Sequence, residues 1–442
     1  MQWNGKASAG KRYGFLASVL YSVLMLAACG TSATQQAGAP PSGSPAGAPP
    51  AAVSPAPGDG QAGQDAGKPG APAAGQAPES DKAKSSVGTA ETPAAEPTRL
   101  ADMSFILVKQ GWTVEETAKG SIVWKTTDGG DAWSKASVQD WLIRGIGFAD
   151  AQQGWSVGKS DCKEMQGQRL CSRLRIAYTK DGGGNWSTQL EQKVKEISLY
   201  TEDRVFAVNP SQAYAIAVER MFMTGDGGRH WNELNFHIGP FLPEQASFDK
   251  DGKHGWVMGR AGKGCKPDQQ EAGQSCAIAV VKTSDGGAHW KLQWSPQDST
   301  GQRTVGISFI NPSKGWMMIL NMENLQSSLY GTTDGGTQWT KLSEMRGGRP
   351  YTRGLQFVSE TTGFVPLSAG AGPIGGGLAV TRDGGKTFER EVPQGKEWSF
   401  EQLQFFNERE GWVRVSDPSK GDYLVYTADA GKQWKTSVPA VK

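Results

Sequence analysis

The sequence has few of the residues from which most catalytic and metal centres are built. Its 442 residues include only four histidines and five cysteines, and neither His-Glu-x-x-His nor Cys-x2-Cys spacing occurs. The formal net charge is +2, which argues against a nucleic-acid footprint. The glycine-rich stretch 370–377 lacks the Lys-Ser or Lys-Thr of a phosphate loop. We therefore expect no metal, no cofactor and no nucleic-acid partner.

A sustained helical period of apolar residues is also lacking, so we expect few helices. Instead, one phrase recurs seven times: a Thr, an Asp two residues later, then Gly (Ala430 in the last copy), and an aromatic residue five positions beyond the Asp. The seven Asp residues are Asp128, Asp181, Asp226, Asp285, Asp334, Asp383 and Asp429. They are separated by 53, 45, 59, 49, 49 and 46 positions, a period typical of propeller blades.

A second phrase accompanies the first, 12 to 29 residues before each Asp. It is a small residue followed by an aromatic one, at Gly111-Trp112, Gly154-Trp155, Ala213-Tyr214, Gly255-Trp256, Gly315-Trp316, Gly363-Phe364 and Gly411-Trp412. A short apolar run ends seven or eight residues before that aromatic, and turn formers separate the segments. Each unit thus has room for four strands, and the sequence predicts an all-β fold: a seven-bladed propeller of four-stranded antiparallel blades over residues 98–442.

The recurring Asp has a mechanical interpretation. An Asp at the head of a tight turn accepts hydrogen bonds from backbone N–H groups ahead of it, and the following glycines adopt positive φ. The closing aromatic folds back between strands and is buried. The alternative is a set of seven cation or substrate ligands. We favour the structural role, because all seven copies carry the same turn chemistry.

These phrases resemble a known family signature. The Thr-x-Asp-Gly-Gly-x-x-Trp phrase is similar to the Asp-box, or BNR repeat, of sialidases and related propellers. Its pairing with an upstream Phe-x6-Gly-Trp, as from Phe148 to Trp155 and from Phe309 to Trp316, resembles the photosystem II stability and assembly factor family. The resemblance covers residues 99–442. It implies a seven-bladed propeller that uses an arginine-rich patch to engage a membrane-protein client.

The first hundred residues predict export and anchoring. Three basic residues precede an apolar segment from Phe15 to Leu26, and Leu26-Ala27-Ala28-Cys29 follows. This pattern indicates a signal peptide over residues 1–28. Cys29 resembles a lipobox cysteine, which implies a diacylglycerol anchor in the cell membrane on its extracytoplasmic face; an ordinary signal peptide is the alternative. Residues 29–97 are rich in Ala, Pro and Gly and almost free of large apolar side chains, so we expect a disordered tether.

The four remaining cysteines form two close pairs, each within an extended loop between the second and third strands of a blade. We expect disulfides between Cys162 and Cys171 and between Cys265 and Cys276, since an exported protein folds under oxidising conditions. A tetrahedral zinc centre is the alternative.

The sequence gives little support for an enzyme. The sialidase phrase Phe-Arg-Ile-Pro is absent, and the nearest string, at residues 174–177, lacks the Pro. No pair of carboxylates can be singled out for glycoside hydrolysis. We therefore expect a non-enzymatic protein that binds a protein or peptide partner. A carbohydrate- or wall-polymer-binding propeller is the alternative, which exposed rather than buried Trp residues would favour, and a sialidase-like hydrolase ranks below it.

Candidate binding residues lie on the predicted first strand of each blade, which should line the central channel. Four positions before the end of these strands, five of seven residues are charged, and we interpret them as a partner-binding rim: Arg144, Asp203, Glu244, Arg353 and Glu401. A rim of salt bridges with a purely structural role is the alternative.

Overall fold

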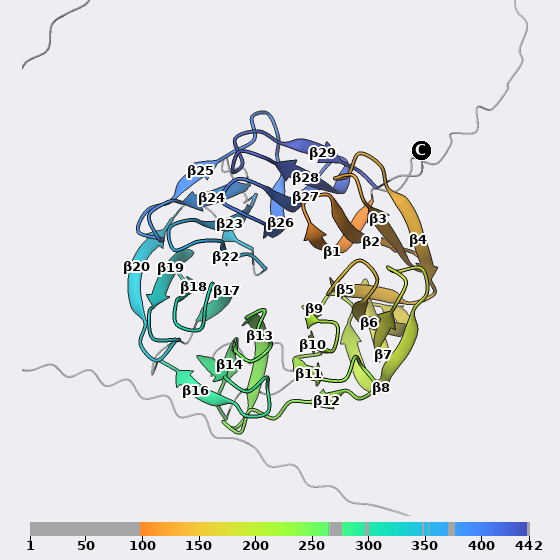
Figure 1. The fold of residues 1–442 in the computed structure, drawn as a ribbon, viewed down its shortest axis with the longest axis horizontal. Helices are drawn as coiled ribbons and strands as arrows, with labels where there is room; N and C mark the ends of the chain where they lie inside the picture. Colours follow the sequence, from red (N-terminus) through yellow and green to blue (C-terminus); the bar gives the residue numbers. More distant parts are fainter. Residues whose placement is uncertain are drawn as a thin grey trace, which may run out of the picture. The chain divides into compact units, whose positions relative to one another are not determined.

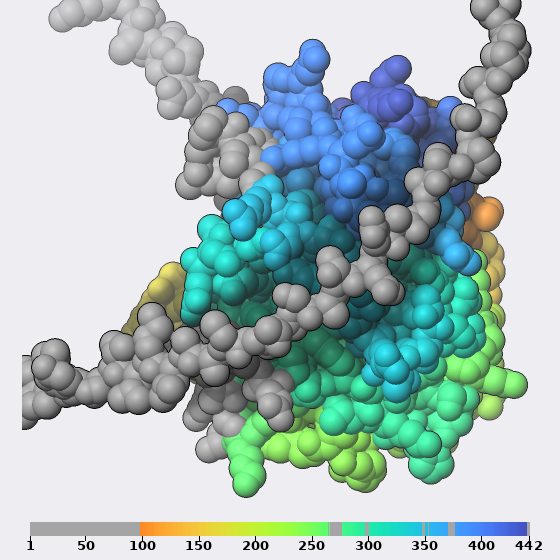
Figure 2. Space-filling view, turned by 90° about the vertical axis from the view of Figure 1, so that its left-hand side faces the viewer, coloured from red at the N-terminus to blue at the C-terminus, as the bar shows by residue number. Residues whose placement is uncertain are grey.

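The computed structural model describes residues 98–263, 265, 276–296, 299, 301–346, 349–351, 353–369 and 376–439. These residues form seven antiparallel sheets, arranged as blades around a central axis, and contain no helix (Figure 1). Figure 2 shows blades of the rim from the side, following one another in chain order from green to blue. The predicted signal peptide, Cys29 and the tether lie outside the described residues. Within the described ranges, no helix is long and apolar enough to cross a membrane.

Each blade is one continuous stretch of chain, and its first strand is the innermost (Figure 1). Blade 1 contains β1 (Arg99–Leu107), β2 (Gln110–Thr117), β3 (Gly120–Thr126) and β4 (Ser134–Gln139). Blade 2 contains β5 (Leu142–Phe148), β6 (Gly154–Met165), β7 (Gln168–Thr179) and β8 (Ser187–Ser198). Blade 3 contains β9 (Arg204–Asn209), β10 (Gln212–Ala217), β11 (Arg220–Thr224) and β12 (Asn232–Glu233). Blade 4 contains β13 (Phe241–Phe248), β14 (Gly255–Ala261), β15 (Ala277–Thr283) and β16 (Lys291–Trp294).

The remaining blades follow the same plan. Blade 5 contains β17 (Gln302–Phe309), β18 (Gly315–Asn321), β19 (Gln326–Thr332) and β20 (Thr340–Met345). In blade 6 the inner strand is split into β21 (Arg349–Pro350) and β22 (Gln356–Phe357), followed by β23 (Gly363–Ser368), β24 (Gly377–Thr381) and β25 (Glu389–Glu391). Blade 7 contains β26 (Ser399–Phe405), β27 (Gly411–Asp417), β28 (Gly421–Thr427) and β29 (Lys435–Ser437). The expected seven-bladed, all-β propeller is confirmed.

The Asp-box turns share one hydrogen-bond pattern. In blade 2, the Thr179 hydroxyl donates to Asp181 Oδ1 at 2.8 Å and accepts from the Gly183 N–H at 2.9 Å. Asp181 Oδ1 also accepts the N–H of Asn185, and the N–H of Gly182 donates to a carbonyl in the β5–β6 turn. Both turns therefore lie on the same face of the propeller, which we call the Asp-box face. The other six copies repeat these bonds.

The Gly-Trp phrase joins neighbouring blades. Trp112 is fully buried, stacks on Phe148 of the next blade with ring centroids 3.7 Å apart, and donates its indole N–H to the carbonyl of Gly182. The small residue before it is a packing requirement, because a Cβ at Gly111 would lie 2.2 Å from the ring of Phe105. Blade 3 has Ala213 at the equivalent position, where its partner on the inner strand is Ala207 rather than a Phe.

Within the described residues, ring closure uses side-chain and backbone hydrogen bonds together with one isolated parallel β-bridge between Thr98 and Gly421 of β28. The amide of Gln404 in blade 7 accepts the N–H of Phe105 at 2.9 Å and donates to its carbonyl at 2.6 Å. The N–H of Asp422 donates to the Thr98 carbonyl, and its carboxylate accepts the N–H of Leu100. Two elements that are about 300 residues apart in sequence are thereby joined at several points.

Candidate functional site

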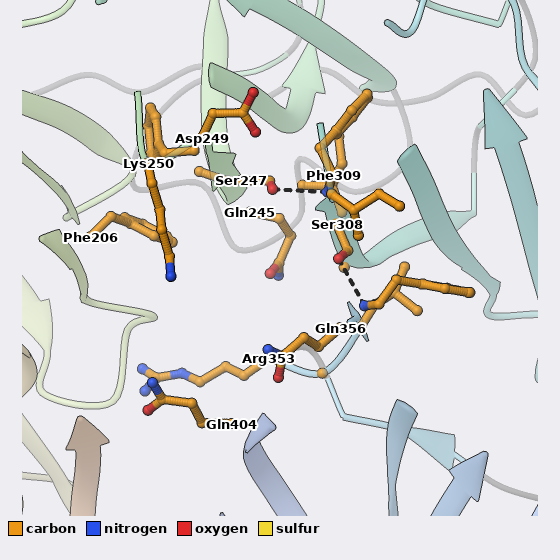
Figure 3. A pocket seen from close by; sticks show the side chains of 18 of the residues that line it. Phe206, Gln245, Ser247, Asp249, Lys250, Ser308, Phe309, Arg353, Gln356 and Gln404 are labelled. Carbon is orange, nitrogen blue, oxygen red and sulfur yellow. Dashed lines mark hydrogen bonds between the residues drawn. The ribbon is translucent and has the colours of Figure 1, made fainter. Parts of the chain in front are cut away.

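The centre of the propeller is an open cavity. Its larger part has a volume of about 760 Å³ and a smaller adjoining part about 270 Å³, and both are lined by Arg204, Phe206, Arg353 and Gln404. The larger part opens toward the Asp-box face, because its lining includes the β13–β14 and β17–β18 turns. Figure 3 shows Lys250 extending from the β13–β14 turn toward the cavity, with Arg353 and Gln404 on the other side.

The cavity wall consists of two rows of residues from the inner strands. Each inner strand has one residue that pairs with the small residue of the Gly-Trp phrase: Phe105, Phe148, Ala207, Phe248, Phe309, Phe357 and Phe405. Because side chains alternate along a strand, the residues one and three positions before this residue face the channel. The lower row, one position before it, contains Ser104, Gly147, Phe206, Ser247, Ser308, Gln356 and Gln404. The upper row contributes Asp102, Arg204, Gln245, Gly306, Gly354 and Gln402 to the lining.

Most polar side chains of the lower row join adjacent blades. The Ser247 hydroxyl accepts the N–H of Phe309 in the next blade at 3.0 Å, and Ser308 accepts the N–H of Phe357 at 2.9 Å (Figure 3). Ser104, Gln356 and Gln404 make the equivalent bond to their own neighbours. Five of the seven blade junctions are tied in this way, so these hydroxyls and amides have a structural role.

The arginines of the cavity belong to a charged network. Arg353 Nε donates to Glu202 at 2.7 Å, and its Nη1 lies 3.7 Å from the carboxylate of Asp102. Burial disfavours the Arg353 guanidinium, but Glu202 and Asp102 outweigh this effect and raise its pKa. Arg204 donates to Gln245 at 2.6 Å. Burial and the adjacent Arg353 lower the pKa of Arg204 to about 10, so its guanidinium remains charged at neutral pH.

Each of the five predicted rim residues is engaged in an ion pair. The pairs are Arg144–Glu116, Asp203–Lys159, Glu244–Arg260, Arg353–Glu202 and Glu401–Arg414. Only Arg353 lines the cavity. Three of the others, Arg144, Glu244 and Glu401, are residues at which the pairing of the inner strand with its neighbour skips one position. Such β-bulges turn a side chain away from the alternating pattern.

The buried partner of Asp203 is Lys159. Both side chains are inaccessible to solvent, their charged atoms are 2.5 Å apart, and the ammonium group also donates to Thr201 and to the carbonyl of Leu199. Desolvation lowers the pKa of Lys159, and Asp203 opposes this shift. The pair joins blades 2 and 3, where the inner strand has Ala207 in place of the Phe found in the other blades.

The cysteines are paired as expected. Cys162 and Cys171 face each other on β6 and β7 with Cα atoms 3.9 Å apart, and Cys265 and Cys276 are bonded with Cα atoms 5.5 Å apart. These disulfides account for all four cysteines outside the N-terminal segment, so they are not available as zinc ligands.

Among the residues that the structure describes, one group of side chains has the composition of a metal site. Ligand atoms of Asp249, Asp251 and His254 in the β13–β14 turn lie within 4.8 Å of one another. Asp251 already accepts the N–H groups of Lys253 and His254, and His254 Nδ1 lies 2.7 Å from its second oxygen. The equivalent turn of blade 5 has the same backbone bonds around an asparagine, Asn311. The bonds of Asp251 therefore have the geometry of a turn.

Sequence reasoning did not identify Asp102, Glu202, Arg204, Phe206 or Gln245. Four of the five chosen positions were one residue away from those that face the channel. Counting back in steps of two from the residue directly before Phe105, Ala207 and Phe248 reaches Asp102, Phe206, Arg204, Glu202 and Gln245.

The burial of the tryptophan side chains tests the alternative of a carbohydrate-binding platform. Every Trp in the described part of the chain is buried or half-buried, and those of the Gly-Trp phrase are at most 1% exposed. They pack between blades, where they cannot stack on a sugar.

Comparisons with known proteins support the fold. No family model matches the sequence, and no curated protein matches it. Among solved structures, YCF48 bound to D1 peptide is similar, with a TM-score of 0.51, 18% identity, and coverage of 75% of this chain and 94% of the other. A prolyl endopeptidase has a TM-score of 0.51 and 9% identity over 78% of this chain, but only 48% of the peptidase chain is covered. The protein is thus a seven-bladed β-propeller that resembles YCF48, a photosystem II assembly factor, in fold.

Proposed function

We propose that this chain is an exported, lipid-anchored, non-enzymatic propeller that binds a protein or peptide partner in its central cavity and assists the assembly or stability of an envelope complex. The observation that carries the proposal is the cavity of about 760 Å³ between the inner strands, in which Arg204, Phe206 and Arg353 meet. Its volume is in the range of ligand sites, and its opening leaves room for a chain to enter.

Two further points support a polypeptide as the ligand. YCF48, which shares this fold, is bound to D1 peptide in its structure. Arginine and a partly accessible aromatic side chain are the residue types enriched at protein interfaces. The proposal places the site in the cavity rather than on the predicted rim, because Arg353 is the one residue of the predicted rim that lines the cavity.

The alternatives fit the cavity less well. A carbohydrate platform needs an exposed tryptophan, and the described tryptophans are packed between or within blades. A glycoside hydrolase needs two carboxylates facing each other across a cleft. The cavity carboxylates are Asp249 and Asp251, which share one turn, and Asp102, which accepts the N–H of Ile146 at 2.8 Å.

A photo-crosslinking amino acid in place of Lys250 tests the site of binding. Lys250 is exposed at the cavity mouth, whereas Lys341 is exposed on the outer strand β20 and is the matched control position. We expect the probe at position 250, in cells that produce the protein, to capture a defined polypeptide that the probe at position 341 does not. Identical capture patterns at the two positions would rule out the cavity as the site.

The anchor requires a separate test. We expect wild-type protein to sediment with membranes and the Cys29→Ala variant to remain soluble, because two acyl chains give stable anchoring. A Cys29→Ala variant that stays equally membrane-bound would exclude lipidation at this residue.

A further inference from the structure

One sector of the cavity wall differs from the rest. At the lower-row position, five blades carry a serine or glutamine that bonds to the next blade, but blade 3 carries Phe206. The ring of Phe206 contacts Phe248 edge to face at 5.6 Å, yet the residue is only half-buried and lines both parts of the cavity. Its apolar surface is therefore available to a ligand.

Arg204 lies two residues before Phe206 on the same strand and faces the same cavity. Residues two apart on a strand are about 6.6–6.8 Å apart along it. The Arg204 side chain is 14% exposed and lies 3.6 Å from Glu202. Arg353 also faces Glu202 and Asp102, so a ligand carboxylate would be the third carboxylate beside these two guanidinium groups. Its binding would come from charge-assisted hydrogen bonds to the guanidinium groups, which are strong in a partly desolvated setting.

We propose that Arg204 and Phe206 together recognise an extended polypeptide segment with a carboxylate side chain and an apolar side chain two residues apart. In an extended peptide these two side chains point to the same side, with the same spacing as Arg204 and Phe206 on β9. A segment with the acidic and apolar residues adjacent presents them on opposite sides and engages only one of the two. This inference specifies the ligand of the proposed function and therefore rests on it.

The size of the cavity sets the length of the recognised segment. A volume of about 760 Å³ accommodates a ligand of drug-like size, which corresponds to a few residues of a polypeptide. Recognition then depends on a short motif, and the remainder of the partner stays outside the cavity.

Labelled hexapeptides that bind the full-length protein can test this spacing by fluorescence anisotropy. The probes are Glu-Ser-Leu and Leu-Ser-Glu cores, their adjacent counterparts Glu-Leu-Ser and Leu-Glu-Ser, and cores with Gln in place of Glu or Ala in place of Leu. We expect the better of the two spaced cores to bind about tenfold more tightly than the adjacent and Gln cores, since each change removes one of the two contacts.

Variants assign the contacts to residues. Phe206→Ser introduces the residue that the equivalent positions of β1, β13 and β17 carry, and we expect it to abolish the preference for Leu over Ala in the probe. Arg204→Gln should abolish the preference for Glu over Gln. Leu292→Ser and Arg382→Gln, at exposed positions outside the cavity lining, are the matched controls and should preserve both preferences. Circular dichroism identifies any variant that fails to fold.

Two outcomes overturn the inference. The first is equal affinity for spaced and adjacent cores, and the second is a folded Phe206→Ser variant that retains the full Leu preference. If either occurs while the probe at position 250 still captures a polypeptide selectively, only the two-residue motif is refuted. If selective capture also fails, the proposed function is refuted as well.

Discussion

The Lys159–Asp203 pair offers a strong test of how burial determines the contribution of an ion pair to the free energy of unfolding. Asp203 and Asp161 each have a carboxylate oxygen 2.5 Å from a cationic nitrogen, of Lys159 and Arg173 respectively. The first pair is fully buried, whereas the side chains of the second are 36% and 57% exposed. Asp203→Asn and Asp161→Asn are therefore the same chemical change in two dielectric environments.

The two substitutions should differ several-fold in their effect on the free energy of unfolding. Asp203→Asn leaves a buried ammonium group without its counter-charge, and breaking a buried pair costs about 3–5 kcal/mol. Asp161→Asn removes an exposed pair, for which about 0–1 kcal/mol is typical. Because desolvation already lowers the pKa of Lys159, the folded Asp203→Asn variant binds its proton more weakly than the unfolded chain does. Its stability should therefore rise with pH on the alkaline side of neutrality.

Urea denaturation monitored by tryptophan fluorescence, with disulfides intact, measures both effects. We expect a clearly lower midpoint for Asp203→Asn at pH 7, partial recovery at pH 9, and little change for Asp161→Asn. Equal midpoints for the two variants would refute the view that burial of this pair determines its contribution.

Three further predictions concern the repeats and the ring. Ala430 adopts φ of 61°, a conformation that is strained for alanine, where the other Asp-boxes have Gly. Ala430→Gly should therefore stabilise the protein by about 1 kcal/mol in thermal denaturation, and an unchanged stability would contradict the strain at Ala430. Hydrogen bonds from the backbone and side chain of Asn185 lower the pKa of Asp181 to about 2. Its contribution to stability should be lost as pH falls from about 4 toward 2, and the loss should be smaller in Asp181→Asn, as acid titration of folding would test. Gln404→Ala should speed hydrogen exchange at the Phe105 amide, and unchanged exchange would exclude its role in closure.

The fold could be predicted from sequence because its repeats are tied to packing. A Gly at the start of the second strand leaves room for the Phe at the end of the first, so the two residues recur together. Where Phe is absent, as at Ala207, the Gly is replaced by Ala213. Sequence spacing alone thus carries information about contacts within and between blades.

The site was less predictable because a displacement of one position along an inner strand changes which side chains face the channel. Arg144 and Glu401 lie four positions before Phe148 and Phe405 and were assigned to the channel, although they form ion pairs outside the cavity lining. The β-bulges at these two residues have no separate signal in the sequence. Phe206 gave little signal, since aromatic residues are common in strands.

Hydrogen exchange on the full-length protein, with and without the polypeptide captured at position 250, tests most directly whether the cavity is the binding site. We predict slower exchange in the inner strands that border the cavity, above all in β9 (Arg204–Asn209) and β13 (Phe241–Phe248), and unchanged exchange in the outer strands. Protection confined to the outer strands or to the β6–β7 hairpin, with β9 unchanged, would contradict binding in the central cavity.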